Sequence, residues 1–324
     1  MKIIIPVAGV GKRLRPHTHS LPKPLLAVAG KPVLAHILDQ VVGLNPDEVV
    51  FIVGYRGDEI RRWVAENYSF PSRFVRQDKL LGLGYALNLG LDEVDAGPVL
   101  VILGDTIVDC DLDAMTAAGE YVLGLRAVDD PTRFGIAEVA DGVVVKLEEK
   151  PADPKSNLAL IGLYYFAELS GLKSALEELV RSGATTRGEI QLTDALEIMI
   201  RRGTEFRTYE VAGWYDCGKK ETMLETNAQL LAKLPPPQPI DGCVLIPPVF
   251  IADDANVTGS VIGPNVSISS GSTIEHSVIR NAIIGNRSTI ANMVLADSLI
   301  GNDVSLRGTQ HVLNIGDHSV LQTS

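Results

Sequence analysis

Short apolar runs alternate with amphipathic segments over the first third of the chain. The runs have the length of single strands, and the segments between them have helical spacing: strands are expected at Ile3–Val7, Val49–Val53 and Val99–Leu103, and helices at Pro32–Val42 and Gly57–Asn67. Buried runs of this length that alternate with helices are typical of parallel strands joined by helical crossovers. The pattern therefore predicts a parallel α/β unit at the N-terminal end.

A second set of strand-like runs follows and is less regularly interrupted by helices. The runs are Tyr121–Leu125, Ile136–Val139, Val143–Leu147 and Leu158–Phe166, and two amphipathic segments come after them at Gly171–Arg181 and Gln191–Arg202. Strands without intervening helices favour antiparallel neighbours. We therefore predict one α/β domain of Rossmann-like type with a mixed sheet.

A proline-rich run separates this domain from the rest of the chain. Leu234 is followed by three prolines, Gln238 and Pro239. Proline cannot continue a helix, and a run of prolines forms a stiff extended connector. We expect a catalytic domain at residues 1–234, a linker at 235–239 and a second domain at 240–324.

The second domain contains an internal repeat. Four similar octets occur at Val261–Ile268, Ile283–Ile290, Leu299–Leu306 and Asn314–Leu321. Aliphatic residues recur every five or six positions, and Gly and Asn stand between them. This spacing suits a triangular solenoid with one inward side chain per face, and it resembles a short left-handed parallel β-helix of hexapeptide repeats. An antiparallel β-sandwich would show strict two-residue alternation, so we rank it second.

Charge and cysteine usage narrow the choice of partners and compartment. The 324 residues carry a net charge of −11, which argues against a broad nucleic-acid-binding surface but leaves room for a local cationic cleft. The three cysteines lie far apart, and no segment has the length of a membrane span. We expect a cytoplasmic protein that binds neither nucleic acid nor membrane.

A glycine loop with nearby cations follows the first strand candidate. Ala8, Gly9, Gly11, Lys12 and Arg13 lie in this loop, and Lys23 comes soon after in Leu21-Pro22-Lys23-Pro24-Leu25. Exposed backbone N–H groups and cations at the end of a strand suit phosphate oxygens. The spacing fits neither a Walker A loop nor a dinucleotide fingerprint. A tight turn with solvated basic residues is the alternative interpretation.

Two later segments carry groups that suit a nucleotide and its metal. The side-chain amide of Gln77 offers both a donor and an acceptor, and Gly82 lets backbone groups come close to a ligand. The segment Gln77–Ala86 resembles the base-reading element Q-x4-G of the sugar nucleotidylyltransferases, which implies that Gln77 and Gly82 contact a pyrimidine base. Asp105 follows the run Val99–Leu103, where ligands bind in α/β folds, and its carboxylate suits Mg²⁺. Taken singly, these residues could equally be an exposed amide and an ordinary turn residue.

Together these motifs resemble those of the sugar nucleotidylyltransferases. The glycine loop is similar to the family signature G-x-G-x-R-L-x-P followed by P-K-P, with Lys12 in place of the usual Thr or Ser, and its entry Pro6–Gly9 looks like that of UTP–glucose-1-phosphate uridylyltransferases. The resemblance implies that Arg13 and Lys23 bind phosphates during catalysis. It also implies that Asp105 and Asp216, the latter in a W-x-D-x-G segment, hold Mg²⁺.

The same resemblance assigns a sugar-phosphate site to the middle of the chain. Phe134-Gly135 and Glu148-Glu149-Lys150-Pro151 match the family's [YF]-G and E-K-P elements, and Arg187–Asp194 also resembles a family segment. The residues implied to bind the sugar phosphate are Gly135, Glu149, Lys150, Asn157, Gly162 and Tyr164.

These resemblances imply transfer of a nucleotidyl group from dTTP or UTP to glucose 1-phosphate, with attack in line on the α-phosphate and release of pyrophosphate. The alternatives are mannose-1-phosphate guanylyltransferase, a non-catalytic regulatory subunit, and a bifunctional enzyme whose β-helix transfers acyl groups. His276, His311 and His318 are available for acyl transfer. We expect the β-helix to support a homo-oligomer or to bind an effector instead, because flat solenoid faces stack well.

Overall fold

The computed structural model describes residues 1–309, which divide into two compact units. The first unit consists of Met1–Leu26 and Lys31–Thr226, and the second of Ala27–Gly30 and the chain from Asn227 onward. Helix α7 (Lys220–Leu231) carries the chain from one unit to the other. The units divide before the proline run, and the separate linker at 235–239 stays a prediction.

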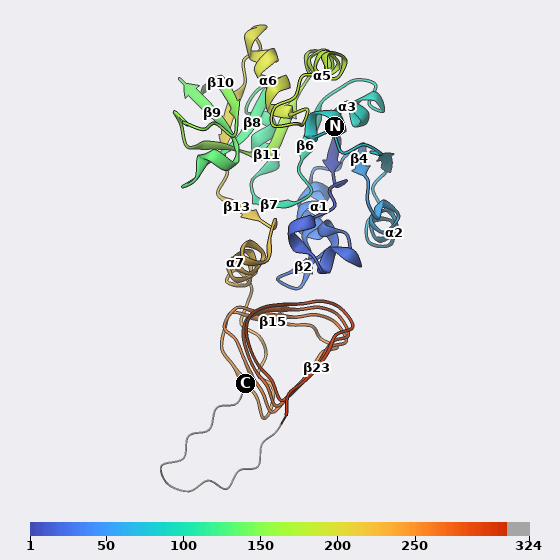
Figure 1. Ribbon diagram of the computed structural model, residues 1–324, viewed down its shortest axis with the longest axis vertical. Helices are drawn as coiled ribbons and strands as arrows, with labels where there is room; N and C mark the ends of the chain where they lie inside the picture. Colours follow the sequence, from blue (N-terminus) through green and yellow to red (C-terminus); the bar gives the residue numbers. More distant parts are fainter. Residues whose placement is uncertain (310–324) are drawn as a thin grey trace, which may run out of the picture. The chain divides into compact units, whose positions relative to one another are not determined.

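A nine-stranded mixed sheet forms the centre of the first unit (Figure 1). The strands lie in the order β5 (Ser72–Arg76), β4 (Glu48–Val53), β1 (Lys2–Pro6), β6 (Val99–Ile102), β11 (Leu158–Phe166), β8 (Tyr121–Ala127), β12 (Arg207–Glu210), β10 (Val143–Glu149) and β9 (Gly135–Ala140). The first four strands are parallel, and β11 runs antiparallel to β6 and β8. The mixed α/β fold predicted from the sequence is confirmed.

Six helices accompany this sheet: α1 (Val33–Gly43), α2 (Gly57–Asn67), α3 (Leu83–Asp92), α4 (Leu112–Ala117), α5 (Ser170–Ser182) and α6 (Leu192–Arg201). The apolar faces of α3, α5 and α6 share one buried cluster with the sheet, in which Phe166, Leu172, Leu196 and Phe206 are fully buried. Burial of this apolar surface is the main force that holds the unit together. The carboxyl ends of the parallel strands are thereby fixed relative to one another.

A small two-stranded sheet lies apart from the main one. Strand β7 (Thr106–Asp109) pairs antiparallel with β13 (Gly213–Asp216), although about a hundred residues separate them in the sequence. The register places Asp216 opposite Thr106 and Gly213 opposite Asp109. This pairing brings two distant sequence motifs to one place.

The second unit is a parallel β-helix, drawn as a triangular coil in Figure 1. One group of strands comprises β14 (Val244–Leu245), β17 (Val261–Ile262), β20 (Val278–Ile284), β22 (Val294–Ile300), β18 (Val266–Ile268) and β15 (Val249–Ile251), and the other comprises β16 (Asn256–Thr258), β19 (Thr273–Glu275), β21 (Thr289–Ala291) and β23 (Ser305–Arg307). Buried Ile262, Ile268, Ile274, Ile279 and Ile290 form its core. The solenoid prediction is confirmed for three octets, and the fourth, Asn314–Leu321, lies outside the described residues.

Buried serines join successive coils of this β-helix. The hydroxyl of Ser277 donates to the carbonyl oxygen of Glu275 at 2.7 Å and accepts from the backbone N–H of Met293 at 3.1 Å. Ser260 and Ser272 accept in the same way from Ser277 and Ser288 of the next coil. Backbone groups that face the interior are thus satisfied, as buried polar groups must be.

The side chain of Asn227 also satisfies buried polar groups, at the start of the second unit. Its fully buried side chain accepts from the backbone N–H of Ala29 at 2.8 Å and from Ser267 at 2.9 Å, and it donates to the carbonyl oxygen of Asn265 at 3.2 Å. The short segment Ala27–Gly30 is held in this unit by such contacts.

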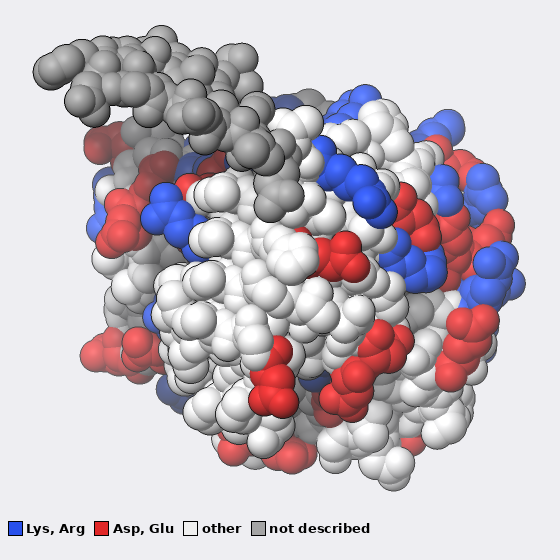
Figure 2. Space-filling view, turned by 90° about the horizontal axis from the view of Figure 1, so that it is seen from below, with Lys and Arg blue, Asp and Glu red and all other residues white. Residues whose placement is uncertain are grey.

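Charges on the outer surface are mixed. On the face that Figure 2 shows, acidic and basic side chains surround a broad uncharged area, and no continuous basic surface is visible there. Within residues 1–309, the helices are too short or too polar to cross a membrane.

Candidate active site

The glycine loop lies at the carboxyl end of β1, in the middle of the parallel strands. Ala8 is buried, whereas Gly9, Lys12 and Arg13 are exposed. Gly11 has a φ of 65°, in the left-handed region that favours glycine, and it begins the short 3₁₀ turn Lys12–Leu14. The loop thus presents backbone and cations beyond the end of the sheet, as predicted.

Lys23 and Asp105 meet beside this loop. The ammonium group of Lys23 donates to Oδ2 of Asp105 at 2.8 Å, and Thr106 donates to Oδ1 at 3.3 Å. Lys23 is buried, with 7% of its surface exposed, while half of the Asp105 side chain is exposed. A buried ammonium needs such a partner, because an unpaired buried charge is costly.

The surroundings of Asp105 keep it ionised. Burial by itself would raise its pKa, but the charge and hydrogen bond of Lys23, the hydrogen bond of Thr106 and the charge of Arg13 outweigh burial, and the pKa is lowered. Opposite charges nearby favour the charged form of a carboxyl group. Asp105 is therefore a carboxylate at neutral pH, as a metal ligand must be.

Asp216 comes to the same place through the pairing of β7 with β13. It lies opposite Thr106, the neighbour of Asp105, and residues opposite each other in antiparallel strands are about 5 Å apart. A Cβ on Gly218 would lie 2.8 Å from Oδ1 of Asp216 and 3.0 Å from Nη2 of Arg13, so both groups converge on Gly218. The two carboxylates and the Arg13 guanidinium line one cavity.

This cavity has a volume of about 470 Å³. Four of the six residues expected to bind the sugar phosphate line it: Gly135, Glu149, Lys150 and Tyr164. Glu149 and Lys150 follow one another at the end of β10, and their charged groups pair at 3.1 Å. The Glu149 side chain is 8% exposed, and its second oxygen accepts from the hydroxyl of Thr193 at 2.6 Å. Both oxygens of Glu149 are thus oriented by neighbours on the cavity wall.

Gly135 lies beside the Thr193 hydroxyl and the Glu149 carboxylate and has no side chain that would crowd them. A Cβ at this position would lie 2.8 Å from the Thr193 hydroxyl oxygen and 3.1 Å from Oε2 of Glu149. Contacts this close do not occur between real side chains without displacement. The absence of a side chain at Gly135 therefore gives a ligand access to Glu149.

Three aromatic residues, Phe134, Tyr164 and Trp214, also line the cavity. Tyr164 is buried, and burial, with the charges of Glu149 and Asp105, raises its pKa, so it remains a neutral phenol. Trp214 packs edge-on against Phe134 with ring centroids 5.0 Å apart. The Trp214 indole N–H is buried without a hydrogen-bond partner among the described residues.

Two expected sugar-site residues do not line this cavity. Asn157 is exposed and precedes β11, where its carbonyl oxygen accepts from Val128. Gly162 is a backbone position with a φ of 91°, where a Cβ would lie 2.8 Å from Leu103. Because Leu103 lines the cavity, Gly162 contributes by letting that side chain pack.

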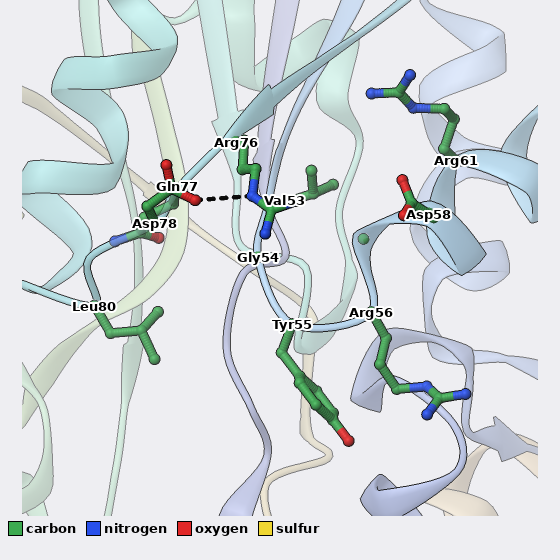
Figure 3. A pocket seen from close by; sticks show the side chains of 11 residues that line it. Val53, Gly54, Tyr55, Arg56, Asp58, Arg61, Arg76, Gln77, Asp78 and Leu80 are labelled. Carbon is green, nitrogen blue, oxygen red and sulfur yellow. Dashed lines mark hydrogen bonds and ion pairs between the residues drawn. The ribbon is translucent and has the colours of Figure 1, made fainter.

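Gln77 lines a second cavity of about 450 Å³ at the ends of β4 and β5 (Figure 3). Its side chain is buried, and its amide N–H donates to the carbonyl oxygen of Lys79 at 3.1 Å. Leu80 and the segment Val53–Asp58 also line this cavity, together with the charged side chains of Arg61, Arg76 and Asp78. The cavity therefore offers hydrogen-bond donors and acceptors, the Gln77 amide among them, to a polar ring.

Gly82 is held by a neighbouring segment of the first unit. It has a φ of 110° and directly precedes α3, and a Cβ there would lie 2.5 Å from the carbonyl oxygen of Ile190. Gly84 donates to the same oxygen at 2.9 Å, and Ile190 donates to Leu81 at 2.7 Å. The start of α3 is therefore fixed, as a close approach to a ligand requires.

Some wall residues were not singled out from the sequence. Thr193 lies in the Arg187–Asp194 segment, whose family resemblance was noticed without a role for its hydroxyl, and Arg187 in that segment donates to the carbonyl oxygen of Lys150 at 2.7 Å. Thr106 follows Asp105 directly. The role of Thr193 has no sequence signal, because its partner Glu149 lies far along the chain, whereas Thr106 donates to Asp105 directly before it.

Comparisons with known proteins identify the family of this chain. The family model for nucleotidyl transferases matches residues 2–233. A glucose-1-phosphate thymidylyltransferase of Streptomyces griseus is 35% identical over 295 residues, which cover 86% of this chain and 81% of that protein. The low-salt glycan biosynthesis nucleotidyltransferase Agl11 of Haloferax volcanii is 33% identical over 88% of this chain and 87% of its own length.

Two further similarities are more restricted. The bifunctional protein GlmU of Methanocaldococcus jannaschii is 35% identical, and the match covers 72% of this chain but 55% of that protein. A crystal structure of a UDP-glucose pyrophosphorylase with UDP-glucose superposes with a TM-score of 0.63 over 72% of this chain and 99% of that one, at 23% identity, and supports the fold. From its family match and its relatives, the chain belongs to the nucleotidyl transferase family and is an enzyme of that type.

Proposed function

We propose that this enzyme joins dTTP, or UTP, to glucose 1-phosphate and releases pyrophosphate. The observation that carries the proposal is that Arg13, Asp105 and Asp216 line the same cavity as Glu149 and Lys150. Relatives named as glucose-1-phosphate thymidylyltransferases, 35% and 34% identical to this chain, support the choice of sugar and base.

The reaction needs alignment and charge neutralisation more than a protein nucleophile. A phosphate oxygen of the sugar phosphate forms a bond to the α-phosphorus, the bond to pyrophosphate breaks, and pyrophosphate leaves with the electron pair. Arg13 and Lys23 would neutralise charge on the triphosphate, and Lys150 would bind the sugar phosphate. Glu149, held by Thr193, would accept hydrogen bonds from sugar hydroxyls.

Asp105 and Asp216 would hold Mg²⁺. Carboxylate oxygens are the ligands that Mg²⁺ prefers, and the ion keeps several positions for phosphate oxygens and water. The described residues contain no group of three or more His, Cys, Asp or Glu side chains that could hold an ion. Two carboxylates with phosphate and water therefore fit Mg²⁺, which would supply charge neutralisation to the phosphate oxygens.

The nucleobase would bind in the second cavity, against Gln77. The amide can pair with the edge of a pyrimidine, which offers both an acceptor and a donor. Mannose 1-phosphate with GTP is the runner-up pair. Acyl transfer is not proposed, because the GlmU match covers 55% of that protein. Of its three candidate histidines, His311 and His318 lie outside the described residues.

The test is pyrophosphate release over a grid of four nucleoside triphosphates and several sugar 1-phosphates, with and without Mg²⁺. We expect the greatest kcat/KM for dTTP or UTP with glucose 1-phosphate, and loss of both activities together in Gln77→Ala. A preference for GTP with mannose 1-phosphate would replace the proposed substrates with the runner-up. Self-association and a cytoplasmic location remain parts of the proposal.

A further inference from the structure

A short turn that the proposed function does not use packs on the glycine loop. The 3₁₀ turn His17–His19 contains Thr18, which is 2% exposed. The Thr18 hydroxyl donates to the carbonyl oxygen of Gly11 at 3.0 Å. Its methyl group fills the space beside Gly11, because a Cβ on Gly11 would lie 2.9 Å from it.

The other end of this turn is anchored to the loop between β4 and α2. The carbonyl oxygen of His19 accepts from the Tyr55 hydroxyl at 3.2 Å and from Nη1 of Arg56 at 3.1 Å. Figure 3 shows both side chains extending to the same side of their loop, away from Arg61 and Gln77. Two donors from one loop thus hold one carbonyl oxygen of the turn.

The Arg56 side chain is itself fixed in direction. Its Nε and Nη2 groups both pair with the carboxylate of Glu59 in the first turn of α2, which leaves Nη1 for His19. A guanidinium bound to a carboxylate by two parallel hydrogen bonds has a defined plane. The anchor is therefore built on a helix of eleven residues rather than on a free side chain.

We infer that the turn His17–His19 is a strap that positions the glycine loop for the triphosphate, with Thr18 as the positioning residue and Arg56 as its anchor. Gly9 and Gly11 have no side chains with which to fix their own backbone. A loop that binds phosphates through its backbone must hold its geometry closely, since small displacements reduce binding and rate. This inference rests on the proposed function, because it assumes that the loop binds a triphosphate.

The first experiment removes the hydroxyl without changing the shape of residue 18. We expect Thr18→Val to raise the dissociation constant and the KM for dTTP about three- to tenfold, the range for one lost hydrogen bond. The KM for glucose 1-phosphate should stay unchanged, and Thr18→Ser should recover most of the dTTP affinity. Ser20→Ala is the matched control, because its hydroxyl contacts His17 rather than the glycine loop.

The second experiment weakens the anchor. Arg56→Lys cannot pair with Glu59 through two hydrogen bonds and reach His19 as well, so the KM for dTTP should rise in the same direction as in Thr18→Val. Arg73→Lys is its control, since Arg73 is a surface arginine paired with Glu48 and Glu93. Thermal unfolding of each variant shows whether it is folded at the assay temperature.

The outcomes separate the strap from the proposed function. If the unaltered protein neither binds dTTP in calorimetry nor releases pyrophosphate with any substrate pair, the proposed function fails first. If it binds dTTP, and Thr18→Val binds dTTP equally well or Thr18→Ser is as impaired as Thr18→Val, the strap is wrong. Equal rises in both KM values would also overturn it, because they indicate a general loss of structure.

Discussion

Asp105 and Asp216 lie beside each other only because β7 pairs with β13, and this gives a direct test of the metal site. Asp105→Asn and Asp216→Asn keep the shape of the side chain but remove a charge. We expect each to reduce turnover about 10²- to 10³-fold, as for other lost electrostatic groups. Turnover of the double variant should be little lower than that of the less active single variant, since both carboxylates would act through one ion. Turnover measured against Mg²⁺ concentration checks this, and a near-normal single variant would exclude that residue.

Gly135 gives a prediction about the sugar site. The atoms nearest to a Cβ here are the Thr193 hydroxyl oxygen, Cδ1 of Leu160 and Oε2 of Glu149. All three are ends of side chains rather than backbone, so Gly135→Ala should fold normally but misplace the Glu149 carboxylate. We expect the KM for glucose 1-phosphate to rise about tenfold or more, the scale of a misfit in a binding pocket, with little change for dTTP. Gly43→Ala, where a Cβ meets open space, is the control. Equal effects of the two substitutions would contradict the assignment.

His17 predicts how stability depends on pH. Burial lowers its pKa from 6.5, so the folded protein takes up this proton less readily than the unfolded chain. As the pH falls through 6.5, the unfolded chain is protonated first, and the free energy of unfolding should decrease. His17→Gln should flatten this part of the curve. Urea unfolding at several values between about pH 7.5 and about pH 5 measures how the free energy of unfolding depends on pH in the unaltered protein and in the variant. Parallel curves would show that His17 does not contribute.

At the scale of elements, the serine contacts between coils predict a local contribution to stability. Ser277→Ala removes a donor to Glu275 and leaves the half-buried N–H of Met293 without its acceptor. We expect a loss of about 1–3 kcal/mol in the unfolding of the β-helix, the cost of an unsatisfied buried group. Ser298→Ala removes a similar bond, to Ala296, and no described N–H depends on it, so it should cost less. Chemical unfolding followed by circular dichroism compares the two.

The sequence predicted elements best where their own pattern defines them. Helix Gly57–Asn67 and strand Leu158–Phe166 have the bounds that were expected, because their apolar spacing is regular. Helix α3 was not predicted, since Gly84 and Gly90 reduce its intrinsic helix propensity, and its stability comes from burial of Leu87 and Leu91. Strands β7 and β13 have four residues each and are defined by each other, which no local pattern reveals.

In the candidate site too, local motifs predicted some residues, and the roles of others depend on the fold. Arg13, Lys23, Asp105, Asp216, Glu149 and Lys150 were identified from motifs, and the structure brings them to one region of the first unit. Thr193 and Thr18 were not assigned, because a hydroxyl acquires its role only from the atom it meets in the folded chain. Asn157 was assigned by resemblance and does not line the cavity. Motifs thus indicated the charged groups, whereas the groups that orient them required the fold.

At the scale of the whole molecule, one column of side chains supports the prediction of self-association. Val244, Val261, Val278 and Val294 lie in register on successive strands, and three of them are 56%, 45% and 80% exposed. A flat column of exposed aliphatic side chains favours contact with another surface. We expect Val278→Lys to reduce the mass measured by light scattering without changing the circular dichroism spectrum. Arg280→Lys on the same strand is the control, and an unchanged mass in Val278→Lys would place the contact elsewhere.

The chain enters the second unit twice, first for the four residues Ala27–Gly30 and again at Asn227. A gene fusion that exchanged only the C-terminal part would therefore bring a new β-helix to a tetrapeptide selected for the old one. Ring atoms of Phe250 already lie 2.6 Å from where a Cβ on Gly30 would stand, so this tetrapeptide tolerates little variation. Recombination among relatives should succeed when the tetrapeptide and the β-helix come from the same parent. The tetrapeptide in the N-terminal part of the sequence thus has to match the β-helix in the C-terminal part, and we expect the two segments to be inherited together.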